Sequence, residues 1–571
     1  MLGAFILIAI GVFFPRAWYD SVPQNAEIPA APIKGVTLFQ ILFVLEGLVL
    51  LVLSRLPRML DPVPQAQQIR GSSAPAQDDT LAHRDAMRGL AAITILALGL
   101  RVYGAGSDLW IDEISTVLTA TKMSALHIFA SYLTSNNHLL NTLLVKLSMH
   151  LFGGAEWAVR LPVIVLGTAT IPAFYWVTRI GFSRRVSLSA ALLLSVTYHH
   201  IFFSQNARGY VPYLFFTLVS SGLLCRALER DSVRIWVAYV ASVVLGFAFL
   251  LNMFFVVAAQ FLVAGVAVWK LRSDGRWPWA LIKRLAIVYG TSAALATQVY
   301  ALTLPQVYMY TKTAYRQPTA GYSILSLDFF HEVIRGLAKA LGPTGLMLLP
   351  LAAIGGLVLA FGFFKLFQRH WLLALVLLAP SFLTAGFVAM NQLSASPRFF
   401  LMAMFPGILA GIVIFEWLLG RVLGPATTPR FRRSFAAGIV LLSMLQLVPL
   451  RHYYATAKQP FRASLAFLQT ERRPGDVVIS VYLTDLAYQY YGAKFGLNDA
   501  NCIYARTQEA FDAALAAHPR DKIFIVTTLH RILGLALPNL VARLRSEWEP
   551  VRVFQATLGD GEVMVWRAKA N

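Results

Sequence analysis

An adjacent pair of carboxylates in the segment SDLWIDEIST (107–116) is the first feature of the sequence that could do chemistry. Asp112 and Glu113 follow Trp110, shortly after a long apolar run. A carboxylate at the aqueous edge of a cavity can accept the proton of an attacking hydroxyl, as a general base does. The alternative is a solvated or helix-capping pair. Taken alone, an acidic pair in a loop favours this structural interpretation.

A second polar segment is SNNHLLNTLL (135–144), in which Asn136, Asn137 and His138 precede a short apolar helix. Asparagine is a preferred N-cap, so a structural role explains these residues without further assumptions. The functional alternative places Asn137 and His138 near the acidic pair, where they would bind substrate. A divalent metal is also possible, and Glu113 and His138 are then its candidate ligands. A lone histidine is more often structural.

Two further segments place arginine at the ends of apolar runs. The segment YHHIFFSQNARGYVPY (198–213) contains four candidate substrate-binding residues: His200, Gln205, Arg208 and Tyr210. The segment SASPRFFLMAMFP (394–406) contains one more, Arg398. The guanidinium group matches the geometry of phosphate, so these arginines could hold an anionic group. The alternative is that each one only extends its charge from the membrane edge into water.

The composition of the chain shows which elements must position these residues. Of 571 residues, 57% are hydrophobic and 13% are charged, against roughly 25% charged in average soluble domains. Long apolar runs then predict a helical membrane protein, because lipid tolerates only helices or closed barrels. The net charge of +21 suggests nucleic acid at first sight. Most of the basic residues, however, lie in short connectors between apolar runs, so we expect no nucleic-acid partner.

About 20 apolar residues are needed to cross a bilayer. Thirteen segments fit this length approximately: 2–19, 36–54, 88–105, 160–180, 187–204, 209–228, 233–250, 252–270, 281–303, 342–364, 371–390, 399–420 and 434–450. Basic residues concentrate in alternate connectors, which predicts a cytoplasmic N-terminus and an extracytoplasmic C-terminal domain. This alternation requires that 138–152 does not cross. The outward ends of separate helices would then meet around Asp112, with Arg208 and Arg398 close by.

The predicted architecture is mainly α, a polytopic helical bundle followed by an α/β domain. Its parts are an extra N-terminal hairpin (1–60), a cytoplasmic linker (61–87), a membrane module (88–450) with an outward loop (105–159), and the α/β domain (451–571). Alternating helix and strand patterns in the last part predict a partly parallel sheet. The outward segment 304–341 contains Tyr308, Tyr310, Tyr315 and Gly321 and is a candidate mobile lid. Cys225 and Cys502 imply no disulfide framework.

The order of these motifs resembles bacterial members of the protein O-mannosyltransferase and lipid A aminoarabinose transferase superfamily. The resemblance extends from about residue 88 to about residue 485 and is carried by six elements: Trp110–Asp112–Glu113, the helix start at His138, GAEWAVRLP (154–162), SQNARGY (204–210), Arg398 with Pro406, and PFRASLAFLQTERRPGDVVIS (460–480).

This resemblance implies a GT-C fold, a polyprenyl-phosphate-linked sugar donor and an inverting transfer on the outer face of the bacterial inner membrane. Asp112 would be the catalytic base, and basic groups would stabilise the departing phosphate. The superfamily often has His-Pro-Pro where this chain has His138–Leu139–Leu140, and Glu where it has Asn206. The resemblance therefore carries no metal or sugar contact over to Asn206.

The expected partners are the polyprenyl-phosphate sugar, membrane lipid, and a glycan, lipid or protein acceptor. The alternative from another class is a polytopic lipid or sugar transporter or flippase without transferase activity. A transporter predicts ionisable residues deep inside helices and often repeated halves. In this sequence the notable charges lie at helix ends and in loops, which favours the enzyme.

Overall fold

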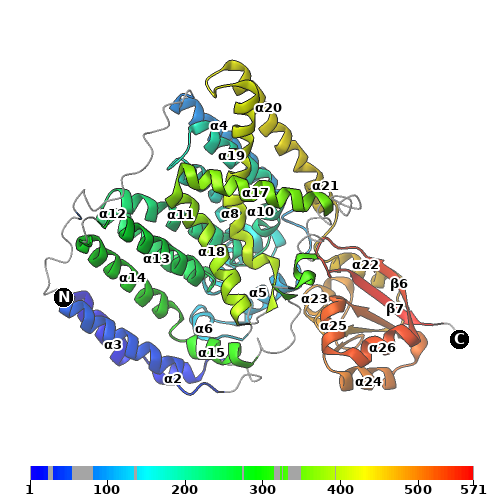
Figure 1. The fold of residues 1–571 in the computed structure, drawn as a ribbon. Coiled ribbons are helices and arrows are strands. Elements are labelled where there is room, and N and C mark those ends of the chain that lie inside the picture. The colour runs from blue at the N-terminus through cyan, green and yellow to red at the C-terminus, as the bar shows by residue number, and fades with distance from the viewer. Residues whose placement is uncertain are drawn as a thin grey trace.

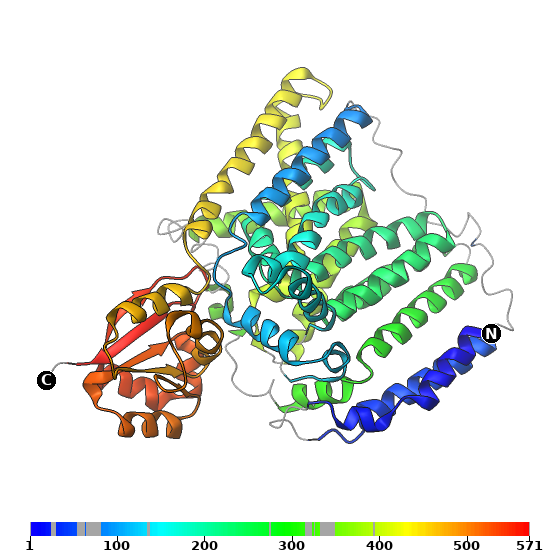
Figure 2. The same ribbon diagram turned by 180° about the vertical axis from the view of Figure 1, so that it is seen from behind.

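The computed structural model describes residues 2–23, 30–53, 63, 81–133, 138–272, 276–313, 322–324, 326–331, 349–391 and 394–569. Figure 1 shows a helical bundle with a smaller α/β domain attached at one end. The N-terminal hairpin lies on the opposite flank of the bundle from that domain, and the reverse view agrees (Figure 2). The prediction of a mainly helical chain with a C-terminal α/β domain is confirmed.

The first half of the bundle contains α1 (Leu2–Phe13), α2 (Arg16–Asp20), α3 (Gly35–Leu53), α4 (His83–Val102), α5 (Ile111–Lys122), α6 (Ala125–Ala130), α7 (Leu139–Phe152), α8 (Glu156–Thr178), α9 (Arg184–Val196), α10 (Tyr198–Ser204) and α11 (Tyr210–Glu229). The second half contains α12 (Val233–Phe249), α13 (Met253–Lys270), α14 (Trp279–Tyr300), α15 (Leu304–Thr313), α17 (Leu349–Arg369), α18 (Trp371–Met390), the 3-10 helix η4 (Pro397–Ala403), α19 (Met404–Leu423), α20 (Pro429–Leu445) and α21 (Leu447–Ala455).

Each of the thirteen predicted spans overlaps one of these helices. Within the described residues, seven helices are long and apolar enough to cross a membrane, or up to nine if each bent pair is one span. The chain is therefore a multi-pass membrane protein. Helices α1 and α12 have 12 and 17 residues, at or below the length of a full crossing. Helix α7, expected not to cross, has 14 residues.

The core of the bundle is a continuous cluster of buried apolar side chains that includes Phe174, Leu194, Leu214, Val263 and Phe405. These come from α8, α9, α11, α13 and α19, so the core joins helices from both halves. Outside the core, α1 packs along α3, and Tyr19 donates a hydrogen bond to the carbonyl of Leu302 at 3.1 Å. The extra hairpin is thereby fastened to the rest of the bundle.

The candidate lid segment 304–341 meets the residues just before η4 through backbone pairing. Strand β1 (Tyr322–Ser323) lies antiparallel to β2 (Ser394–Ala395), just before η4. Of the candidate lid, Tyr308 and Tyr310 lie on α15. Tyr315 and Gly321 lie outside the described residues. The mobility of this segment stays a prediction.

The C-terminal domain has a five-stranded sheet in the order β4-β3-β5-β7-β6. Its elements are α22 (Phe461–Glu471), β3 (Val477–Val481), α23 (Thr484–Tyr491), β4 (Cys502–Ala505), α24 (Gln508–Ala517), β5 (Ile523–Thr527), α25 (His530–Ala536), α26 (Pro538–Glu547), β6 (Trp548–Phe554) and β7 (Val563–Ala568). Strands β3, β4 and β5 are parallel, whereas β7 and β6 are antiparallel additions, so the predicted partly parallel sheet is confirmed.

Helix α5 is held between the bundle and this domain. Leu109, Ile111 and Ile114 share one buried apolar cluster with Phe461 and Leu465 of α22. Fully burying one such side chain is worth about 1.5–3 kcal/mol, so the contact is a substantial one. The start of α5, which carries the acidic pair, therefore takes its position from both parts of the protein.

Candidate active site

Asp112, Arg208 and Arg398 come together although they lie in three separate segments. Arg208 precedes α11 and forms an ion pair with Asp112 through Nη1 and Oδ2. Arg398, on η4, places its Nη1 3.6 Å from the same oxygen. The Arg208 side chain is 3% exposed, that of Asp112 18% and that of Arg398 35%. The cluster thus has a buried inner arginine and a more accessible outer one.

His138 holds Arg208 from behind. Arg208 Nε donates to His138 Nε2 at 3.2 Å, and because guanidinium can only donate, Nε2 must be the acceptor. His138 Nδ1 then carries the proton and donates to the carbonyl of Phe249 at 3.2 Å. Burial and the charge of Arg208 hold the pKa of His138 well below its usual value. The imidazole is therefore neutral and orients the arginine.

The turn before α11 requires glycine. A Cβ on Gly209 would lie 2.2 Å from the carbonyl oxygen of Phe249, so any other residue at this position would clash. Tyr210 follows, and the guanidinium carbons of Arg208 and Arg398 lie 5.1 and 5.9 Å from its ring centre. Such contacts favour a cation by about 0.5–1 kcal/mol or more. Tyr210 thus brings the two arginines together.

The start of α5 is held by groups distant in sequence. The backbone N–H of Trp110 donates to Glu113 Oε2 at 3.3 Å, as the second half of a capping box does. Gln459 Oε1, from the linker into the C-terminal domain, accepts from the N–H of Ile111 at 2.9 Å. Trp110 Nε1 donates to Asn206 Oδ1 at 3.1 Å. These contacts leave the Asp112 side chain directed at the arginines.

Glu113 lies behind Asp112 in a fully buried ion pair with Arg160, and both side chains are 0% exposed. Arg160 donates to both Glu113 oxygens, at 2.8 and 2.6 Å, and the N–H of Ala207 adds a bond of 2.9 Å. Burial raises the pKa of Glu113, but the charges of Arg160 and Lys458 and these hydrogen bonds outweigh it and leave the pKa lowered. The visible contacts of Glu113 are structural, and its contact with substrate stays a prediction.

His200 and Gln205 belong to a different polar cluster. His200 Nδ1 lies 2.6 Å from Arg101 Nη2 on α4. Gln205 donates to the carbonyls of Arg101 and Tyr103 and accepts from Tyr453 on α21 at 2.7 Å. All five side chains except that of Tyr103 are buried. These bonds join α4, α10 and α21, so substrate binding by His200 and Gln205 also stays a prediction.

Lys458 was not anticipated from the sequence. It lies in the linker after α21, is 1% exposed, and its Nζ donates to the carbonyl of Gln205. Burial lowers its pKa from 10.5 to about 7, although the charge of Glu113 opposes the shift. Arg160 was missed too, although an arginine near the start of a long apolar helix is a visible signal. Lys458 has no such signal.

The depressed pKa of Lys458 predicts a pH-dependent stability. Between about pH 7 and 10.5 the unfolded chain binds a proton that the native state lacks, so stability rises with pH in this window. The slope is at most about 1.4 kcal/mol per pH unit. We expect the unfolding temperature of the wild type to rise from pH 7 toward pH 9 relative to Lys458→Met, and the two to run parallel below about pH 7. A constant difference across the whole range would contradict the assignment.

The suggested metal ligands Glu113 and His138 have their polar atoms engaged, as described above. Asn137 lies outside the described residues. Within the part of the chain that the structure describes, one group of metal-capable side chains is found, formed by His530, Asp560 and Glu562 of the C-terminal domain. It is separate from the Asp112 cluster.

Comparison with known proteins gives a family match. Residues 139–294 match the family model of dolichyl-phosphate-mannose-protein mannosyltransferases. The resemblance to the mannosyltransferase superfamily is confirmed over this segment, about a quarter of the chain. The segment includes Arg160, Arg208 and Tyr210 but ends before Arg398 and begins after Asp112. Among curated proteins, no sequence matches the chain.

Several solved structures have a similar chain path. ArnT from Cupriavidus metallidurans bound to undecaprenyl phosphate aligns over 85% of this chain and 98% of its own, with 13% identity and a TM-score of 0.46. Its apo form aligns over 84% of this chain and 98% of its own, with 12% identity and a TM-score of 0.48. A third structure is AglB, the Archaeoglobus fulgidus oligosaccharyltransferase, in complex with an inhibitory peptide and a dolichol-phosphate. It aligns over 81% of this chain and 72% of its own, with 12% identity and a TM-score of 0.46. At these TM-scores the similarity carries no argument about activity.

Proposed function

We propose that this protein is a GT-C-type membrane glycosyltransferase that moves a sugar from a polyprenyl-phosphate donor to an extracytoplasmic acceptor with inversion. The observation that carries the proposal is the position of Asp112, a carboxylate between Arg208 and Arg398 at the ends of membrane helices. The match of 139–294 to a mannosyltransferase family supports it. We place the protein in the bacterial inner membrane, with the N-terminus cytoplasmic and this cluster facing outward.

The reaction needs one displacement at the anomeric carbon of the sugar. The acceptor hydroxyl attacks this carbon as the bond to the phosphate oxygen breaks, and the phosphate leaves with the electron pair. Asp112 takes the hydroxyl proton. Attack opposite the leaving group inverts the anomeric configuration. The leaving phosphate is already an anion, so cationic groups assist its departure more directly than a general acid does.

The two arginines have different parts in this scheme. Arg398 is 35% exposed and accessible to a lipid phosphate, so it can replace its ion pair with Asp112 by one with the phosphate. Arg208 is 3% exposed and tied to His138, so it remains with Asp112 and orients the base. Glu113 and Arg160 pair with each other and position the helix start. His138 is likewise a positioning residue.

A transporter finds less support in the same contacts. Arg101 and Arg160 are buried in helices, as a transport path would require, but both donate hydrogen bonds to backbone carbonyls. Arg160 is in addition paired with Glu113. Such groups are committed to the fold and are poorly placed to carry a substrate. The charged groups of the proposed site, Asp112, Arg208 and Arg398, lie at or just before helix starts, as the enzyme requires.

The proposal is tested with purified protein in lipid, radiolabelled polyprenyl-phosphate sugars and an envelope extract. Hexosyl and pentosyl donors are offered separately, and glycan, lipid and protein fractions are assayed for label. We expect label to move to one fraction, and Arg398→Gln to raise the KM for the donor about tenfold or more, because one charge-assisted hydrogen bond is worth about 1.5–3 kcal/mol.

A matched control lies at the other end of the same membrane span. Arg421 is in the last turn of α19, and Arg421→Gln removes an identical charge far from Asp112. Its KM for the donor should stay at the wild-type value. Movement of the labelled lipid across vesicles without transfer of its sugar would favour the flippase instead.

A further inference from the structure

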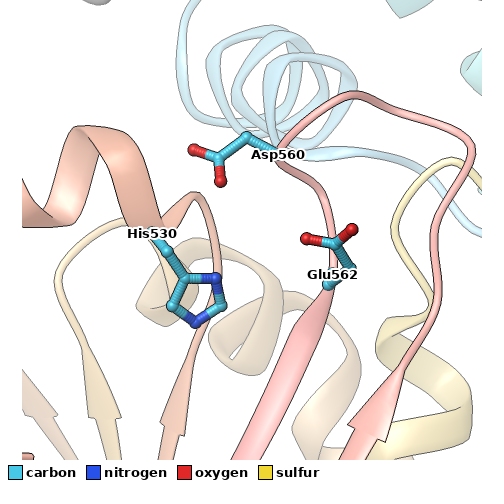
Figure 3. A group of neighbouring side chains, drawn as sticks. All are labelled: His530, Asp560 and Glu562. Atoms are coloured by element: carbon cyan, nitrogen blue, oxygen red, sulfur yellow. The ribbon is translucent and has the colours of Figure 1, made fainter. Parts of the chain in front are cut away.

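A cluster of potential metal ligands lies on the C-terminal domain. His530 is the first residue of α25, whereas Asp560 and Glu562 lie in the connection from β6 to β7. One ligand atom from each side chain lies within 4.8 Å of the other two. Figure 3 shows the imidazole on one side and the two carboxylates on the other. All three residues are partly exposed, so an ion from solvent can reach them.

The imidazole is oriented by groups outside the cluster. His530 Nε2 lies 2.9 Å from Thr527 Oγ1, and this hydroxyl also accepts from Trp566 Nε1 at 2.8 Å. Metal-bound histidines almost always donate their second ring N–H to such an oxygen, which fixes the tautomer and the ring plane. With Nε2 donating to Thr527 in this way, Nδ1 is left for a ligand.

The two segments that supply the ligands are also tied together through the backbone. The N–H of Leu529 donates to the carbonyl of Asp560 at 3.1 Å, and the N–H of Arg531 donates to Asp560 Oδ2 at 2.9 Å. Leu529 has a φ of +51°, a left-handed conformation that leucine rarely adopts. The fold thus holds His530 beside Asp560 at a cost in backbone strain.

The donor set selects a class of ion. One imidazole nitrogen and two carboxylate oxygens suit a divalent ion such as Zn²⁺, since imidazole is a poor ligand for Mg²⁺ and Ca²⁺. Around tetrahedral Zn²⁺, with bonds of about 2.0–2.2 Å, ligand atoms lie about 3.3–3.6 Å apart. The spacing of up to 4.8 Å therefore has to contract by up to about 1.2–1.5 Å, which side-chain rotation allows.

We propose that His530, Asp560 and Glu562 bind one divalent transition-metal ion, with Zn²⁺ as the representative, and that water completes its coordination. The ion would join the start of α25 to the 555–562 connection. This site is independent of the proposed transfer reaction, and either proposal can fail without the other.

The position of the site suggests what the ion does. The connection that carries Asp560 and Glu562 also holds the interdomain linker: the N–H of Thr557 donates to the carbonyl of Ala457 at 3.0 Å. Gly561 packs so closely on this linker that a Cβ there would lie 2.8 Å from the carbonyl of Lys458. The neighbouring Gln459 holds the N–H of Ile111 at the start of α5. The ion would therefore stabilise the attachment of the domain to α5.

The experiment measures Zn²⁺ binding to the full-length purified protein after treatment with chelator. We expect one Zn²⁺ per chain, and a higher unfolding temperature in the loaded protein because the ion binds only the folded site. Glu562→Gln keeps the shape but removes a ligand charge, and should weaken Zn²⁺ binding about tenfold or more. Hydrogen exchange in 555–562 should slow with Zn²⁺ in the wild type and not in this variant.

The matched control is Glu549→Gln, which removes the same charge from an exposed position on β6. It should bind Zn²⁺ as the wild type does. If Glu562→Gln does not fold, His530→Gln tests the same site from the other segment. Equal Zn²⁺ binding by wild type, Glu562→Gln and His530→Gln would overturn the proposal, and so would a wild type that binds no Zn²⁺.

Discussion

Asp112→Asn is expected to lower kcat for sugar transfer by about 10²–10⁴-fold, the usual contribution of a general base. Asparagine keeps the size of the side chain but cannot take a proton from the acceptor hydroxyl. Arg398 would lose a competing anion at 3.6 Å, so the affinity for the phosphate of the donor should hold or rise. The expected result is a large fall in kcat with little rise in the KM for the donor.

The kinetic pattern distinguishes this role from a structural one. If Asp112 only positioned Arg208, its loss would weaken donor binding and change KM more than kcat. Full transfer by the variant would remove the assignment of the base and leave the fold untouched. Both parameters come from steady-state rates at varied donor concentration.

A control variant, Asp231→Asn, measures how much activity is lost when an ion pair outside the candidate site is removed. Asp231 pairs with Arg284 at 3.2 Å, and the two side chains are 5% and 4% exposed. Asp231 follows the C-terminal end of α11, whereas Arg208 precedes its N-terminal end. This variant loses a buried ion pair without touching the candidate site. Its transfer rate per folded molecule should stay within a few-fold of the wild-type rate, while its stability falls.

Arg160→Met is expected to give the largest loss of stability, about 3–5 kcal/mol, because it leaves a buried carboxylate without its partner. Glu113 is 0% exposed and would keep only the N–H groups of Ala207 and Trp110 and the more distant charge of Lys458. Arg160 also donates to the carbonyls of Ala105, Ser107 and Asp108, so the turn before α5 loses its support. Thermal unfolding in detergent measures the effect.

Two further variants test this explanation. Arg160→Met combined with Glu113→Leu removes both charges and should recover part of the loss, since replacing a whole buried pair is often close to neutral. Arg520→Met breaks an ion pair with Glu547 in which the side chains are 56% and 30% exposed, and should cost no more than about 1 kcal/mol. Equal losses for Arg160→Met and Arg520→Met would contradict the structural role of the buried pair.

The C-terminal domain also supports the segment just before Asp112. The hydroxyl of Tyr491 on α23 accepts a hydrogen bond from the N–H of Leu109 at 2.9 Å, and Arg462 on α22 pairs with Asp108. These contacts lie within a few residues of Asp112. Whatever the domain recognises, its docking supports the segment that carries the proposed base.

The amino-acid sequence determined the class of the protein and the main members of its candidate site. Sparse charge and long apolar runs leave few alternatives to a helical bundle, because unpaired backbone groups are too costly in lipid. Asp112, Arg208 and Arg398 stand out because charge near an apolar run needs a reason. The sequence predicts that all three lie on the outward side, but it does not show that they meet. Their contacts follow from the packing of α5, α11 and η4.

The division of roles within the acidic pair depends on how the chain packs in three dimensions. Asp112 and Glu113 are adjacent and alike in sequence, yet one is 18% exposed beside two arginines and the other is fully buried against Arg160. The burial of Lys458 is likewise invisible in the sequence: its Nζ donates to the carbonyl of Gln205, more than 200 residues away along the chain. Desolvation and ion pairing depend on distances through space, and a pattern of neighbours along the chain does not contain them.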